Sequence, residues 1–132
     1  MTYLTEGPAL LLGRLLIAML YLPSGIRKLG TFDATTGNIA AHGLPLPALG
    51  YAIAVAVEVP LSILLILGLW TRPVALMIAI YTVAAAIFFH NHIADPAQGV
   101  NFFKNLAIAG GLLFVFAHGG GTWSLDHRRR KA

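Results

Sequence analysis

Four long runs of apolar residues dominate the chain, and each approaches the length that an α-helix needs to cross a lipid bilayer. The runs cover residues 8–28, 47–70, 71–89 and 102–118. A spanning helix takes roughly 20 apolar residues, at about 1.5 Å of rise each. We therefore expect an all-α protein, a transmembrane four-helix bundle formed by a single domain over residues 1–132.

The connections between these runs differ in kind. Only Trp70-Thr71-Arg72-Pro73 separates the second run from the third, which predicts a tight helical hairpin. Residues 30–46 form a long and partly apolar connection that could fold back onto the bundle. Residues 90–101 contain Asp95-Pro96, a turn signal, and glycines at 119–121 would end the fourth helix.

The composition agrees with a membrane protein. Hydrophobic residues make up 58% of the chain and charged residues only 11%, too few to cover the surface of a soluble domain. The chain has no cysteine, which excludes disulfides, thiolate metal sites, iron–sulfur clusters and a cysteine nucleophile.

The net charge of +4 is concentrated near the C-terminus, in the basic residues 128–131. Four spans place both termini on one side of the membrane. Arg72 would lie on that side too, against Arg27, Lys28 and Lys104 on the other. The positive-inside rule then favours cytoplasmic termini, with residues 119–132 as a basic cytoplasmic tail. Basic residues are not spread over a folded surface, so we expect no nucleic-acid partner.

Helical spacing places polar and small residues of the first run on one face. The residues follow one another at intervals of four, three, four and three: Arg14, Ala18, Tyr21, Gly25 and Lys28. The second run has a similar stripe of Tyr51, Val55, Glu58 and Ser62. The fourth run has Lys104, Ile108, Gly111, Val115 and His118, with Asn105 beside them. The third run offers Tyr81 and Thr82 near three alanines, a composition suited to close packing.

Ionisable groups at membrane depth are costly and are candidates for function. Arg14 and Lys28 lie roughly 21 Å apart along the first helix, and Glu58 lies between them in depth. Glu58 could be held by Arg14 from one side, or by Lys28, Lys104 and Asn105 from the other. Pro60 should kink the second helix and free a carbonyl near Glu58. Glu58 is therefore a candidate proton relay, and the candidate ligand contacts are Arg14, Tyr21, Lys28, Glu58, Lys104 and Asn105.

Structural interpretations of the same residues stay open. Arg14 could extend its guanidinium to the headgroups, and Glu58 could pin neighbouring helices together without chemistry. Lys28 could anchor the helix end at the membrane interface, and Asn105 could join two helices. The sequence predicts no haem, metal or flavin site. A haem held by His90 and His118 is disfavoured, because these residues end antiparallel helices at opposite membrane faces.

Several motifs together resemble the DoxX family, in order and spacing over nearly the whole chain. They are Gly13-Arg14-Leu15-Leu16, Ser24-Gly25-Ile26-Arg27-Lys28-Leu29, Glu58, Gly68-Leu69-Trp70-Thr71-Arg72, Asn101-Phe102-Phe103-Lys104-Asn105-Leu106-Ala107 and Trp123-Ser124-Leu125-Asp126. The resemblance implies a small four-helix protein of the bacterial inner (plasma) membrane. Relatives include the DoxD-type subunit of thiosulfate:quinone oxidoreductase, and others are linked to oxidative-stress and thiol-redox complexes. No catalytic residue can be carried over, but Arg14, Lys28, Glu58, Lys104 and Asn105 match recurring polar positions of the family.

The first functional hypothesis is a membrane subunit of a quinone-linked oxidoreductase system. Its quinone would bind between the helices, and its electrons would come from a redox partner protein or a soluble donor. The second hypothesis is a non-catalytic anchor that recruits redox or stress-response enzymes through residues 30–46 or 90–101. The third is a small proton-coupled transporter, which would usually need a homo-oligomer, because four short helices enclose little space.

Overall fold

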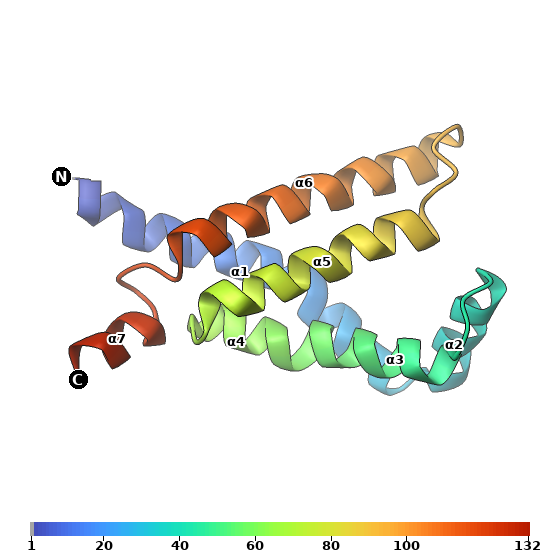
Figure 1. Ribbon diagram of the computed structural model, residues 1–132, viewed down its shortest axis with the longest axis horizontal. Coiled ribbons are helices and arrows are strands. Elements are labelled where there is room, and N and C mark those ends of the chain that lie inside the picture. The colour runs from blue at the N-terminus through green and yellow to red at the C-terminus, as the bar shows by residue number, and fades with distance from the viewer. Residues whose placement is uncertain (1) are drawn as a thin grey trace.

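The computed structural model describes residues 2–132, with side chains from residue 5 onward, and the chain folds into helices joined by short turns (Figure 1). The elements in chain order are α1 (Thr2–Leu29), α2 (Phe32–Ala41), α3 (Pro47–Ala56), the π turn η1 (Val57–Leu61), α4 (Ser62–Leu67), α5 (Thr71–Phe89), α6 (Pro96–His118) and α7 (Leu125–Lys131). The π turn joins α3 to α4, so these three elements form one continuous rod.

Within the described residues, four helical segments are long and apolar enough to cross a membrane: Thr5–Leu29, Pro47–Leu67, Thr71–Phe89 and Pro96–His118. This confirms the all-α transmembrane fold. The fourth segment begins upstream of residue 102, because Asp95 caps it by accepting a hydrogen bond from the Ala97 N–H at 3.0 Å. Pro96 takes the first helical position, where no N–H is needed.

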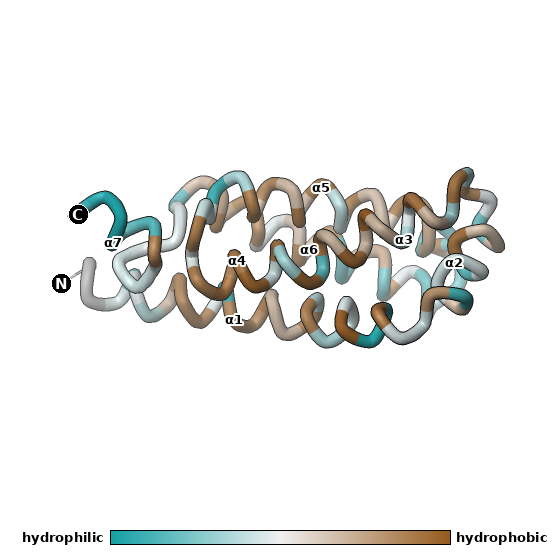
Figure 2. The backbone as a smooth tube through the Cα atoms, turned by 90° about the horizontal axis from the view of Figure 1, so that it is seen from below, coloured by the Kyte–Doolittle hydropathy of each residue, from teal (hydrophilic) through white to brown (hydrophobic). Residues whose placement is uncertain are grey.

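The two ends of the bundle carry different short helices. Both termini and α7 lie at one end, together with the turn between α4 and α5, whereas α2 covers the opposite end (Figure 1). The connection over residues 30–46 therefore contains a helix of its own. Hydrophobic residues line the long helices, and α7 is the most hydrophilic stretch (Figure 2).

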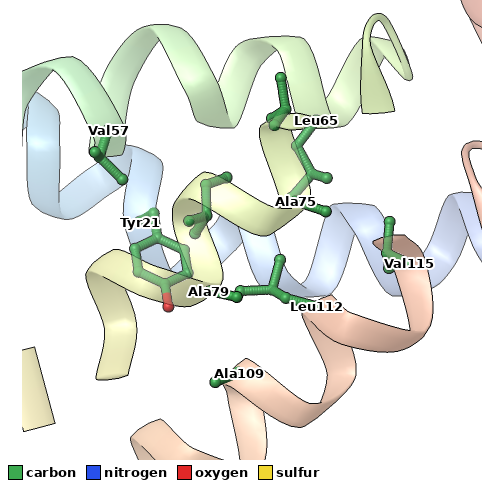
Figure 3. Packing of buried hydrophobic residues seen from close by; sticks show 10 residues of the cluster. Tyr21, Val57, Leu65, Ala75, Ala79, Ala109, Leu112 and Val115 are labelled. Carbon is green, nitrogen blue, oxygen red and sulfur yellow. The ribbon is translucent and has the colours of Figure 1, made fainter. Parts of the chain in front are cut away.

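The buried face of α1 agrees with the stripe that its sequence predicts. Arg14, Ala18, Tyr21 and Gly25 are buried, and Lys28, one turn further, is half-buried. The centre of the bundle lies where α1, α4, α5 and α6 approach one another. Figure 3 shows Leu65, Ala75, Ala79 and Leu112 in this apolar cluster. The spacing of buried residues in α1 was therefore readable from helical periodicity alone.

The stripe predicted for the fourth helix is wrong at both of its ends. Lys104 and His118 are exposed, and the buried residues of that part of α6 are Ala109, Leu112 and Val115. The physical reason is that α6 packs mainly against α5 along a narrow face. That face is turned slightly from the polar stripe, so small and branched apolar side chains define it instead.

At Pro60, where the sequence predicts a kink, the structure has the π turn η1 within the α3–α4 rod. Proline lacks an N–H and its ring crowds the carbonyl four residues earlier, and a π turn relieves both problems by widening the helix locally. Helix α1 approaches η1 closely at Gly25. A Cβ atom there would lie 2.7 Å from Glu58 Cβ and 2.7 Å from Val59 Cγ2. Gly25 thus allows the helix contact on which the position of Glu58 depends.

We expect Gly25→Ala to destabilise the protein by about 1–3 kcal/mol through overpacking against η1. Gly13→Ala is the matched control in the same helix, because a Cβ at residue 13 meets nothing within 4 Å. Alanine there should be neutral or stabilising by roughly 0.5–1 kcal/mol. Thermal unfolding of the two variants in detergent measures the difference. Equal midpoints would contradict the close packing at Gly25.

Candidate functional site

Glu58 lies at the centre of a polar cluster formed by three parts of the bundle. The ammonium of Lys28 donates to Glu58 Oε1 at 3.0 Å and to Oε2 at 2.8 Å. The hydroxyl of Tyr81 donates to Oε1 at 2.6 Å, and Lys28 also donates to Ser24 Oγ at 2.8 Å. We call Ser24, Lys28, Glu58 and Tyr81 the Glu58 cluster. It joins α1, η1 and α5.

The surroundings of this cluster explain why it is so fully paired. The Glu58 side chain is 6% exposed and that of Lys28 is 23% exposed. A carboxylate without partners at that depth would lose its hydration and gain nothing in return. Next to the cluster, Tyr21 hydrogen-bonds the hydroxyl of Thr82, which donates to a backbone carbonyl of its own helix. Polar groups of α1 and α5 therefore satisfy one another inside the bundle.

An apolar cavity of about 480 Å³ opens on one side of the cluster. Its walls carry apolar side chains of α2, α3, α5 and the α2–α3 connection, among them Ile39, Leu44, Ile53, Phe88 and Phe89. Small residues lie between them, at Gly50, Ala54, Ala84 and Ala85. The polar groups that line this cavity are those of Lys28, Thr35, Asn38, Glu58, Tyr81 and His90. A few polar groups in an otherwise apolar cavity of this size are typical of a small-molecule site.

A second, more polar cavity of about 350 Å³ lies beside the same carboxylate. Its polar lining residues include Tyr21, Ser24, Arg27, Thr82 and Asn105. Four residues line both cavities: Glu58, Tyr81, Ala85 and His90. The hydrogen-bonded pair of Glu58 and Tyr81 therefore stands between an apolar and a polar space.

The structure brings together four of the six candidate ligand contacts. Lys28 and Glu58 are bonded, while Tyr21 and Asn105 line the polar cavity with Glu58. Lys104 lies apart, exposed on α6, where it donates to Asn101 Oδ1 at 3.2 Å. Of the partners considered for Glu58 in the sequence, only Lys28 forms an ion pair with it among the described residues.

Arg14 lies in a separate site near the opposite end of the bundle. Its guanidinium donates to the carbonyls of Leu65 at 3.0 Å, Ile66 at 2.8 Å and Trp123 at 2.6 Å. The side chain is fully buried, so it does not extend to the headgroups. Carbonyls at a helix C-terminus have no partner within the helix. Arg14 therefore caps the end of α4 and ties the segment after α6 to it.

Several residues of the Glu58 site were not among the candidate ligand contacts predicted from the sequence: Ser24, Thr35, Asn38, Tyr81 and His90. Tyr81 and Thr82 stood out as polar residues of the third run, but nothing in the sequence paired Tyr81 with Glu58. Thr35, Asn38 and Ile39 line the apolar cavity from α2 at helical spacing. This spacing would have identified the three residues if residues 30–46 had been predicted to contain a helix.

Asp126 attaches α7 to the turn between α4 and α5. One carboxylate oxygen accepts from the Trp70 N–H at 2.8 Å, and the other accepts from the Thr71 N–H at 2.8 Å and the Thr71 hydroxyl at 2.7 Å. The Asp126 N–H donates to the Gly68 carbonyl at 2.9 Å. Burial alone would raise the pKa of Asp126. The hydrogen bonds from Thr71 and Trp70 and the nearby Arg130 outweigh it, so the pKa lies below its ordinary value of 3.8.

We expect Asp126→Asn to lower the thermal midpoint at pH 7, because the amide accepts fewer and weaker hydrogen bonds than the carboxylate. A depressed pKa contributes stability that is present above the unfolded pKa and lost as the pH falls through the folded pKa. The difference in thermal midpoint between the wild type and the variant should therefore become smaller below about pH 4. Thermal unfolding from pH 7 to pH 3 measures it. A gap independent of pH would contradict this role of the Asp126 charge.

Comparison with known proteins places the chain in a family. The model of the DoxX family matches residues 9–91. Inner membrane protein YphA of Escherichia coli K12 is 38% identical over 124 residues, which cover 90% of this chain and 89% of YphA. Inner membrane protein YqjF of the same organism is 29% identical over 126 residues, covering 96% of this chain and 95% of YqjF.

A mycobacterial protein extends the comparison. The uncharacterized membrane protein Rv3486 of Mycobacterium tuberculosis H37Rv is 31% identical over 138 residues, which cover 96% of this chain and 85% of Rv3486. No solved structure matches the chain. The family match covers most of the first span and all of the second and third, and it includes Glu58 and Tyr81. This integral membrane protein belongs to the DoxX family.

Proposed function

We propose that this protein binds a quinone in the apolar cavity beside Glu58, as a membrane subunit of a quinone-linked oxidoreductase system. The observation that carries the proposal is the Glu58 cluster itself. Its members Lys28, Glu58 and Tyr81 line a cavity of about 480 Å³ whose other walls are largely apolar. A quinone needs this combination, because its ring and tail are apolar and its two carbonyl oxygens accept hydrogen bonds.

The cavity suits a flat ring for a second reason. Gly50, Ala54, Ala84 and Ala85 leave room between α3 and α5, where larger side chains would close it. Hydrogen-bond donors of the lining include the Asn38 amide and the Thr35 hydroxyl. They come from α2, whereas the Glu58 cluster lies on the spanning helices. The donors thus lie on more than one side of the space that the ring would occupy.

Reduction of a quinone consumes two electrons and two protons and forms a hydroquinone. An electron-donating partner protein or soluble donor would supply the electrons. In this proposal Glu58 transfers the protons, and its position in the lining of both the polar and the apolar cavity supports that role. It could take a proton from the polar side and release it toward the ligand, while Lys28 and Tyr81 hold its carboxylate in position.

The names of two relatives, both inner membrane proteins, support a place in the bacterial inner membrane. We further propose that both termini are cytoplasmic. Residues 128–131 of α7 are basic, and Arg72 lines the same cavity as Arg129 and Arg130. Apart from the buried Arg14, five basic residues therefore belong to the end of the bundle that carries α7. Arg27, Lys28 and Lys104 belong to the other end, and the excess follows the positive-inside rule.

Reporter fusions test this orientation. A green fluorescent protein fused after Ala132 should fluoresce, because it folds in the cytoplasm, and alkaline phosphatase at the same position should stay inactive. Alkaline phosphatase fused after Ala94, in the α5–α6 turn, should be active. The reverse pattern would place the termini outside the cytoplasm.

Filling the apolar cavity tests where the quinone binds. We expect Ala84→Leu to weaken binding of decylubiquinone to the purified protein by more than about tenfold, because the added carbons occupy the ligand's space. Ala107→Leu adds the same volume on the exposed face of α6 and should leave binding unchanged. Equilibrium dialysis in detergent measures both. Equal affinities, together with no quinone in solvent extracts of the wild-type protein, would refute the site.

A charge variant then tests the proton role. Glu58→Gln should slow quinol formation in membranes supplied with the physiological reductant by roughly 10²- to 10⁴-fold, the usual contribution of a positioned acid or base. Glu6→Gln removes one carboxylate from an exposed position of α1 and is the control. If membranes with Glu58→Gln form quinol at the wild-type rate, Glu58 has no proton-transfer role and only stabilises the helix packing.

A further inference from the structure

A third cavity lies at the terminal end of the bundle, far from the Glu58 cluster. Its volume is about 460 Å³, and it is formed by the α4–α5 turn, the start of α5, the glycines after α6, and α7. Its charged lining residues are Arg72, Asp126, Arg129 and Arg130. We call this cavity the arginine pocket.

The docking of α7 gathers these arginines. Asp126 fixes the first turn of α7 against Trp70 and Thr71, so that Arg129 and Arg130 face the same space as Arg72. Arg72 comes from a different helix, α5, and lies more than fifty residues earlier in the chain. The three arginines therefore come together only in the folded chain, and the run of basic residues in α7 does not by itself explain the pocket.

Charge in the arginine pocket is unbalanced. It holds three guanidinium groups and one carboxylate. That carboxylate already accepts three hydrogen bonds from Trp70 and Thr71. Within the described part of the chain, none of the three arginines forms a salt bridge. Arg129 does lie over the Trp70 ring, with its Cζ 5.9 Å from the ring centre. Three cations held together in this way favour an anion between them.

In a bilayer crossed by the four apolar segments, the pocket would lie at the depth of the lipid headgroups. Helix α4 ends at Leu67 and α6 ends at His118, next to it. Trp70, on its rim, is 57% exposed, as expected of an aromatic residue at a membrane interface. The anionic groups most abundant at that depth are the phosphates of lipids.

We propose that the arginine pocket binds a phosphate group, for which a phospholipid headgroup is the source that its position favours. Planar guanidinium groups match phosphate oxygens with paired hydrogen bonds, and basic pockets at helix ends hold anionic lipid headgroups. The pocket shares no lining residue with the two cavities beside Glu58. This phosphate site is therefore independent of the proposed quinone function.

The test compares two variants of equal charge. Arg129→Gln/Arg130→Gln removes two cations that line the pocket, and Arg128→Gln/Lys131→Gln removes two cations of the same helix that do not. Purified protein in detergent is titrated by calorimetry with dioctanoyl-phosphatidylglycerol. We expect the first variant to weaken binding by about tenfold or more and the second by about twofold at most. Arg72→Gln, which leaves α7 untouched, should weaken binding by about fivefold or more.

Further titrations identify the source of the phosphate. Dioctanoylglycerol lacks the phosphate and should not bind the pocket. Binding of the phosphatidylglycerol without competition from millimolar inorganic phosphate would support a lipid headgroup, and effective competition would support a phosphate site open to free anions. Equal losses in the two double variants, or wild-type affinity in Arg72→Gln, would overturn the proposal by showing only a diffuse basic surface.

Discussion

The ion pair between Lys28 and Glu58 is the interaction on which the candidate site depends. A bilayer interior offers no water, so a carboxylate there needs partners supplied by the protein itself. Lys28 reaches Glu58 because α1 packs against the π turn at Gly25, where no side chain intervenes. The pair therefore fixes α1 against η1, and Tyr81 adds α5 to the same contact. Glu58 and Tyr81 of this contact line both cavities, so the contact between α1, η1 and α5 determines where the cavities lie.

Arg14 and Glu58, the buried charged residues among the described side chains, are held in different ways. Glu58 is paired with side chains and borders open space, which leaves it accessible to a ligand or a proton. Arg14 donates to backbone carbonyls and is fully enclosed. Its hydrogen bonds close the end of α4 and hold the segment before α7. Burying either charge costs free energy. Hydrogen bonds to backbone carbonyls offset that cost for Arg14, and hydrogen bonds from Lys28 and Tyr81 offset it for Glu58.

The two short helices outside the spans build the pockets at the ends of the bundle. Helix α2 adds polar and apolar side chains to the cavity beside Glu58. Helix α7 adds Arg129 and Arg130 to the arginine pocket, and Asp126 holds that helix in place. Four apolar spans by themselves would leave both spaces open to the membrane surface. The two short helices therefore give each end of the bundle different lining residues.

The sequence by itself determined the four spans, the buried face of α1 and the position of Glu58 within the second span, because span length and helical periodicity are local properties. Tertiary structure alone decided that Lys28 and Tyr81 hold Glu58, that Arg14 binds carbonyls, and that Lys104 lies outside the site. The partners of Arg14 could not be predicted from the sequence, because every residue type has a backbone carbonyl. The rotation and depth of each helix against its neighbours depend on the packing of many side chains at once, as the turned face of α6 shows.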